Sequence, residues 1–260
     1  MNKLLIVLVG LVTLAVPAGA LDSLTGYSWA PDVRCENYTH AEIAENNGLM
    51  TDTFPTGNPE VPFVTIHLLC AIEVADQVLP ATDCTSNAYS LTGWYWTSAY
   101  SGQVDTRNTY GISSSQVLNA FNAAGNEWDN SVGADIFGSI VSGGDSKNIR
   151  RQDFVNQHGF KGLGGGGTIA VTYTWSYSDG RAAESDAAYN TFYNWAVDGR
   201  SNAMDLQGIA THELGHTFGM GHTSTASVNQ CLTMYPYGDY GQTYQRTLGD
   251  GDITGINALY

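Results

Sequence analysis

The chain has 260 residues, of which 43% are hydrophobic and 13% are charged, and this balance excludes an intrinsically disordered protein. Ten basic residues against twenty-five acidic ones give a net charge of −15. Such an acidic surface argues against a nucleic-acid partner, because phosphate binding needs a basic footprint. The length allows one or two domains with a hydrophobic core.

The first twenty residues have the pattern of a targeting signal. Lys3 provides a short positive start, residues 4–16 carry no charge, and Ala18-Gly19-Ala20 offers the small residues that a signal peptidase reads. The apolar stretch is shorter than the roughly 20 residues that cross a bilayer as a helix. We therefore expect a signal peptide over residues 1–20 and a secreted, extracellular protein with no stable membrane insertion after cleavage. An uncleaved N-terminal anchor is the alternative.

Four cysteines are compatible with export, since disulfides persist in oxidising compartments. Three pairings are possible. The short separation favours a local bridge between Cys70 and Cys84, which leaves Cys35 to pair with Cys231. No CxxC pair occurs, so a cysteine-based zinc site is not expected.

Residues 21–90 show few periodic segments and contain three of the four cysteines. We interpret them as an N-terminal segment, either a propeptide that is removed or a permanent extension. A different sequence texture begins near Leu91, and we expect a folded domain over residues 91–260.

Helical and strand patterns are mixed in this domain without regular alternation, which predicts an α+β fold rather than a doubly wound one. Ser113 and Gln116 have capping-box spacing before one helix, and Asp205 is placed to cap a second. The expected helices cover residues 113–129, 205–218 and 250–260, and the expected strands cover residues 134–142, 168–176 and 183–190.

The segment HExxHxxGxxH carries the chemistry. On a helix, residues four apart share a face, so His212 and His216 can place ring nitrogens on one zinc ion. Gly219 lets the chain turn sharply out of that helix, because glycine tolerates positive φ, and the turn brings His222 round as a third ligand. Three protein ligands leave a fourth position open for water, which is typical of a catalytic zinc site rather than a structural one.

Glu213 is the candidate general base. It lies about 100° around the helix from His212, where it can reach a water on the metal but not easily the metal itself. We expect it to accept the proton of the attacking water and to pass it to the leaving amine. Zinc lowers the pKa of such a water to about 7 and stabilises the developing oxyanion, so no Ser or Cys nucleophile is needed.

The motif followed by a methionine turn resembles the metzincin zinc peptidases, with Met234 as the methionine. Within that group the chain resembles the matrixins, the matrix-metalloproteinase group. Thr223 follows the third histidine, MYPY at residues 234–237 is similar to the wall of the matrixin S1′ pocket, and residues 248–260 are similar to the C-terminal helix.

This resemblance implies a zincin-type catalytic domain with a twisted mixed β-sheet, about three helices, and the active-site helix followed by the Met-turn. It implies that Met234 forms a hydrophobic floor under the zinc ligands, and that Pro236 and Tyr237 line the substrate pocket. An extended polypeptide would pair through backbone hydrogen bonds with an edge strand. The residues of that strand would be Thr168, Ile169, Ala170, Val171 and Thr172.

The chain also departs from the matrixin pattern. The cysteine-switch sequence PRCGxPD is absent; Arg34-Cys35 matches only part of it, and an even cysteine count favours a disulfide for Cys35. The family's structural-zinc histidines have no clear counterpart between residues 145 and 190. Calcium is common in the family, and Glu184 or Asp186 could contribute ligands, although no calcium-loop pattern is present.

We therefore expect a secreted zinc metalloendopeptidase, a monomer with one catalytic zinc ion, that acts on extended polypeptides. Two other classes stay open, a zinc hydrolase acting on cell-wall peptide and a non-catalytic binding module that kept the metal site. Glu213 argues against the binding module, because a purely structural site needs no general base.

Overall fold

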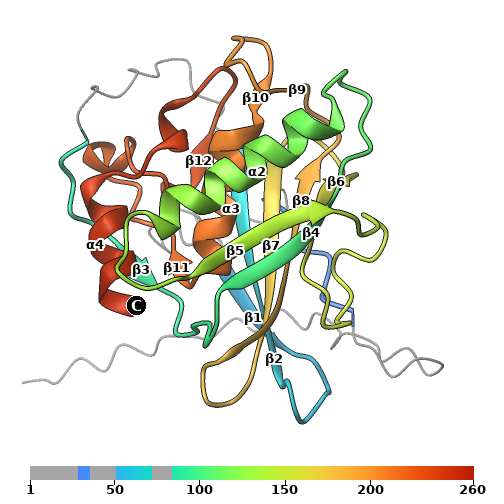
Figure 1. Ribbon diagram of the computed structural model, residues 1–260, viewed down its shortest axis with the longest axis vertical. Helices are drawn as coiled ribbons and strands as arrows, with labels where there is room; N and C mark the ends of the chain where they lie inside the picture. The colour runs from blue at the N-terminus through green and yellow to red at the C-terminus, as the bar shows by residue number, and fades with distance from the viewer. Residues whose placement is uncertain (1–28, 36–50, 72–83) are drawn as a thin grey trace, which may run out of the picture.

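The computed structural model describes residues 29–35, 51–71 and 84–260 (Figure 1). The predicted signal peptide lies outside these residues. No helix in the described part of the chain combines the length and the apolar character needed to cross a bilayer.

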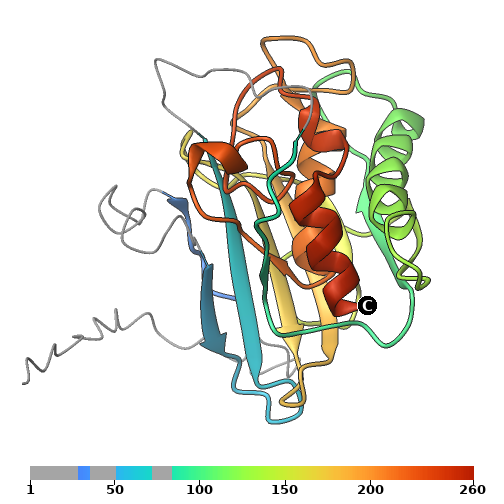
Figure 2. The ribbon, with the colours of Figure 1, turned by 90° about the vertical axis from the view of Figure 1, so that its left-hand side faces the viewer.

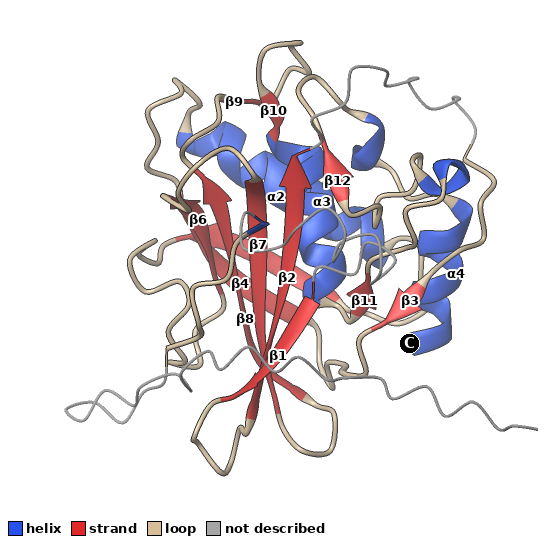
Figure 3. Cartoon of the chain, turned by 180° about the vertical axis from the view of Figure 1, so that it is seen from behind, coloured by secondary structure: helices blue, strands red, loops and turns tan. Residues whose placement is uncertain are grey.

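A single twisted sheet forms the frame of the molecule (Figure 3). Its strands lie in the order β1, β2, β7, β8, β6, β4, β5, and β12 pairs with β2 as an additional strand. From β1 to β8 the neighbours are antiparallel, whereas β8, β6, β4 and β5 are parallel to one another. The strands are β1 (Thr51–Pro55), β2 (Phe63–Ala71), β4 (Tyr100–Asp105), β5 (Phe137–Ser142), β6 (Gln157–Lys161), β7 (Thr168–Ser176), β8 (Ala182–Asn190) and β12 (Tyr237–Gly238).

Three helices cover one face of this sheet (Figure 2). They are α2 (Ser114–Asp129), α3 (Leu206–Thr217) and α4 (Asp250–Leu259). Ser113 and Gln116 form the predicted capping box, and Asp205 accepts a hydrogen bond from the Gly208 amide at 2.9 Å. The predicted α+β fold with a mixed sheet and three helices is confirmed.

Short strands and turns complete the helix side. Strand β3 (Ser90–Leu91) pairs with β11 (Met220–Gly221), and β9 (Trp195–Ala196) pairs with β10 (Met204–Asp205). Two 3-10 turns, η2 (Ser227–Asn229) and η3 (Tyr244–Arg246), lie between α3 and α4.

Two hydrophobic cores lie on the two faces of the sheet. The larger lies between the sheet and the helices, where the Trp128 indole of α2 donates to the Thr211 carbonyl of α3 at 2.8 Å. The smaller lies on the opposite face, where Ala30, Val33 and Cys35 cover the outer side of the sheet. The N-terminal segment therefore supplies part of the second core.

Strand β2 was not predicted from the sequence, although it lies well inside the sheet. Its even-numbered side chains, such as Ile66 and Leu68, enter the outer core, and Leu69 enters the helix-side core. Because both faces of the strand are buried, the polar and apolar alternation that marks a half-exposed strand is weak. The sheet has no break at the proposed boundary before residue 91, and that boundary stays a prediction.

The predicted disulfide pairing is wrong. The bridges join Cys35 to Cys70 and Cys84 to Cys231. Sequence separation sets only the entropy of closing a loop, whereas strand register decides which cysteines meet. Cys70, one residue before the end of β2, lies opposite Thr168, whose hydroxyl accepts the Cys35 amide at 2.8 Å.

The prediction of an edge strand over residues 168–172 is also wrong for the intact chain. These residues open β7, which lies between β2 and β8. The edge position was implied by the matrixin resemblance, and residues 21–90 showed few periodic segments that would have indicated β2.

Candidate metal centre and active site

Helix α3 and the turn that follows it position the three predicted ligands. Asp205 caps the helix and is held by Arg246, whose guanidinium donates to both carboxylate oxygens at 2.8 and 2.5 Å. The helix ends at Thr217 with Phe218 as its C-cap, and Gly219 has a φ of 102°, in the left-handed region that favours glycine. A Cβ at this position would lie 2.5 Å from the Trp94 carbonyl oxygen, so the turn that returns His222 needs a glycine.

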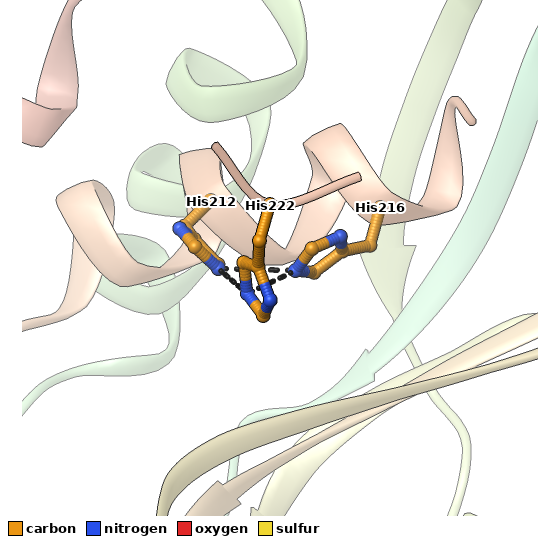
Figure 4. A group of neighbouring side chains, drawn as sticks. All are labelled: His212, His216 and His222. Atoms are coloured by element: carbon orange, nitrogen blue, oxygen red, sulfur yellow. Dashed lines mark hydrogen bonds between the residues drawn. The ribbon is translucent and has the colours of Figure 1, made fainter. Parts of the chain in front are cut away.

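The side chains of His212, His216 and His222 converge on one point (Figure 4). Their Nε2 atoms lie 3.0 to 3.1 Å from one another. A tetrahedral zinc ion with Zn–N bonds of roughly 2.0 Å would place such atoms about 3.3 Å apart, so the spacing fits. Within the described residues, these histidines form the only group of three or more His, Cys, Asp or Glu that could hold a metal.

The outer ring nitrogens of two predicted ligands are hydrogen-bonded to backbone carbonyls. His212 Nδ1 lies 2.6 Å from the Thr233 carbonyl oxygen, and His216 Nδ1 lies 2.9 Å from the Met220 carbonyl oxygen. A carbonyl can only accept, so each Nδ1 carries the proton and each Nε2 keeps a free lone pair. Burial also lowers the pKa of His212 to about 4, which favours the neutral imidazole that binds metal.

Glu213 lies beside the histidines and is fully buried. Its Oε2 accepts a hydrogen bond from the Thr172 hydroxyl at 2.5 Å, while Oε1 has no hydrogen-bond partner in the described structure. Burial raises the pKa of this carboxyl to about 8. The predicted substrate contact of Thr172 concerns its backbone and stays a prediction, while its side chain lies against the predicted base.

Met234 packs beneath α3. A Cβ added to Gly215 would overlap the Met234 Sδ atom. The methionine therefore lies directly against α3, between His212 and His216. The residues predicted to line the substrate pocket contact β2. The Pro236 carbonyl accepts the Cys70 amide at 3.2 Å, and Tyr237 pairs with Cys70.

Asp252 is a supporting residue that sequence reasoning missed. Its carboxylate accepts the amides of Thr233 at 2.8 Å and Met234 at 3.1 Å, and Thr233 in turn accepts from His212. Asp252 thus connects α4 to the predicted ligand His212 through residues 233 and 234. The only sequence signal was an acidic residue in the first turn of the last helix.

His67 was also missed, because the sequence places it in no ligand pattern. Its ring stacks on that of His216, with centroids 4.2 Å apart, and meets Trp94 edge-on at 5.5 Å. Strand β2 brings it there from 145 to 155 residues away in the chain, since the predicted ligands are residues 212 to 222.

The predicted calcium contributors lie elsewhere. Glu184 Oε2 accepts the amides of Asp153 and Phe154, and Asp186 accepts the amides of Arg150 and Gln157. Both carboxylates therefore hold the loop before β6, and calcium binding stays a prediction.

Comparisons with known proteins agree with this geometry. The matrixin family model matches residues 97–260. Human matrilysin is 35% identical over 97 residues, which cover 37% of this chain and 33% of matrilysin. Matrilysin from Felis catus is 35% identical over 97 residues, covering 37% and 34% of the two chains. Metalloendoproteinase 4-MMP from Arabidopsis thaliana is 31% identical over 94 residues, covering 35% and 25%. The chain spans about a third of the length of the matrilysins that it matches.

Proposed function

The chain belongs to the matrixin family, and from that premise we propose that it is a secreted zinc-dependent endopeptidase with Glu213 as its general base. The observation that carries the proposal is the convergence of three Nε2 atoms within 3.1 Å, with a carboxylate one residue after the first ligand. His212, His216 and His222 would hold the ion.

Zinc bound there would act as a Lewis acid that lowers the pKa of a water molecule and stabilises negative charge on a carbonyl oxygen. Glu213 Oε1, which has no other partner among the described residues, would accept a proton from the attacking water. The Thr172 hydroxyl would hold the other oxygen of the carboxylate, so that Oε1 stays directed to the site. The same carboxyl would then deliver the proton to the departing amine.

Met234 and Asp252 would position the site rather than take part in the chemistry. Pro236 and Tyr237 would line the pocket for an extended polypeptide. The backbone of residues 168–172 would pair with that polypeptide through main-chain hydrogen bonds only in a form of the chain in which β2 has left this edge of β7. The two disulfides support export to an oxidising compartment.

The test is hydrolysis of a denatured protein by the zinc-loaded chain, assayed intact and after limited proteolysis within residues 21–90, beside Glu213→Gln. We expect the variant to retain one zinc ion per chain, measured by elemental analysis, and to lose at least about 1,000-fold in turnover. Wild-type turnover in Glu213→Gln would exclude Glu213 as the base. Hydrolysis of cell-wall peptide alone would favour the narrower hydrolase.

A further inference from the structure

The edge of β7 that would bind a peptide is taken by the chain's own strand β2. The two strands are antiparallel, and their register runs from Phe63 opposite Ser176 to Cys70 opposite Thr168. An added peptide strand would use this same edge, because β7 is paired with β8 on its other side.

The pocket wall closes on β2 from the opposite side. Strand β12 runs parallel to β2, with Tyr237 opposite Cys70 and Gly238 opposite Ala71. The C-terminal part of β2 is thus held between β7 and the segment predicted to line the substrate pocket. A bound polypeptide would make backbone contacts with these same two elements.

The side chains of β2 also occupy the site. His67 stacks on His216, and Leu69 is fully buried in the core that contains Ile209 of α3 and Met234. Leu68 points to the opposite face, into the outer core. With β2 in place, the predicted catalytic set has 0% exposed surface. Its members are His212, Glu213, His216 and His222.

We propose that β2 is an internal occupant of the peptide-binding groove, and that the chain is latent as long as β2 stays paired with β7. The proposal rests on the proposed function, because it assigns the groove to peptide substrates. It requires no cysteine–metal bond, since Cys35 is joined to Cys70 at the end of β2 itself.

The disulfides determine where a cut would release β2. The Cys35–Cys70 bridge lies entirely before residue 71, and the Cys84–Cys231 bridge lies entirely after residue 83. One cut between Ala71 and Cys84 therefore separates β2 from the catalytic part without any disulfide joining the two products.

The experiment inserts a recognition sequence for a site-specific protease between Ala71 and Cys84 of the full chain. The matched control carries the same sequence in the turn between Gly57 and Glu60, where a cut leaves β2 joined to the rest of the chain. Cut and uncut proteins are zinc-loaded, diluted in steps and assayed on a denatured protein. Hydrogen exchange of the β7 amides and fragment release by native mass spectrometry are measured on the same samples.

We expect release of the fragment on dilution to expose the β7 amides and to raise hydrolysis by about tenfold or more, because activity follows the open fraction. A synthetic peptide of residues 62–71 with Cys70→Ser should reverse both changes. The uncut chain and the turn-cut control should show neither. A second preparation carries Leu69→Asp, which should promote release of the fragment because it places a charge at a fully buried position. Its control is Phe63→Asp, which places the same charge at an exposed end of β2.

Equal hydrolysis by uncut, turn-cut and Ala71-cut chains would overturn the latency proposal while leaving the proposed function standing. If no form hydrolyses peptides after the fragment has left, the proposed function fails. In that case, hydrogen exchange of the β7 amides alone tests whether β2 occupies the groove. Renewed protection of β7 by the peptide would support it, and failure of the peptide to bind would overturn it.

Discussion

The histidine site and the loop over residues 143–156 both shield polar groups from water. They differ in whether a charged side chain of the protein is hydrogen-bonded to those groups. In the histidine site, three Nε2 atoms face one another, and among residues 29–35, 51–71 and 84–260 no cationic side chain is hydrogen-bonded to them. In the loop, the Lys161 ammonium donates to three carbonyls, at 2.9 Å to Ser146 and 3.2 Å to both Lys147 and Ile149. The loop thus carries its own cation, whereas the histidine site would receive its positive charge from the proposed metal ion.

Two buried carboxyl groups also accept hydrogen bonds from the backbone of this loop. Arg150 and Phe154 have positive φ values of 85° and 61°, a conformation that is strained for residues other than glycine. Asp186 accepts the Arg150 amide and Glu184 accepts the Phe154 amide. The strained backbone is thus held by carboxyl side chains of the chain itself, whereas the Nε2 atoms of the histidine site face only one another within the described structure.

Removal of zinc should have the largest effect and should separate the two regions. A strong chelator is expected to abolish hydrolysis by the Ala71-cut chain and to lower the melting temperature, because bound metal stabilises the folded state. Amide exchange in residues 143–156 should stay as slow as before. Loss of loop protection in a calcium-selective chelator would break the comparison and indicate a calcium ion in the loop.

Asp252→Ala should weaken zinc binding by about 10- to 100-fold, because it removes the support of the Met-turn that orients His212. The measurement is a competition titration with a coloured zinc chelator. Asp250→Ala, at an exposed position two residues earlier in the same helix, is the control and should keep wild-type affinity. Equal affinity in both variants would remove Asp252 from the positioning role.

Lys161→Met should lower the free energy of unfolding by about 1 to 3 kcal/mol, since three carbonyls lose their shared donor. Urea denaturation measures the change, and Lys147→Met, on the exposed part of the loop, serves as the control. Zinc affinity should be unaffected, which would sharpen the distinction between the two regions. A parallel loss of zinc affinity would indicate that they are coupled.

Glu184→Gln should have the smallest effect at low pH and a growing effect as pH rises. Burial raises the pKa of Glu184 from 4.5 to about 9, so the folded protein binds this proton more tightly than the unfolded chain does. Its contribution to stability is therefore greatest below pH 4.5 and is lost as pH rises towards 9. The amide oxygen of Gln can still accept both loop amides, so the variant should show a shallower decline in melting temperature over this range. An unchanged slope would exclude Glu184 as its source.

The metal site could be predicted almost completely from the sequence, whereas the strand that covers it could not. The ligand spacing around His212 and His216 is local to one helix, and the return of His222 depends on a single glycine. His67 and Asp252 reach the site from β2 and α4, and no local pattern marks either contact. β2 itself was hidden because burial on both faces weakens the period-two pattern.

The sequence by itself determined the three helices, the capping residues, the zinc-binding motif and the matrixin resemblance, because each depends on residues only a few positions apart. Only the tertiary structure decided the disulfide pairing, the burial of the catalytic set and the occupation of the β7 edge by β2. The occupation of the β7 edge depends on pairing between residues about 100 positions apart, which is set by strand register, and the Cys84–Cys231 bridge joins residues 147 positions apart. Local spacing in the sequence determines neither.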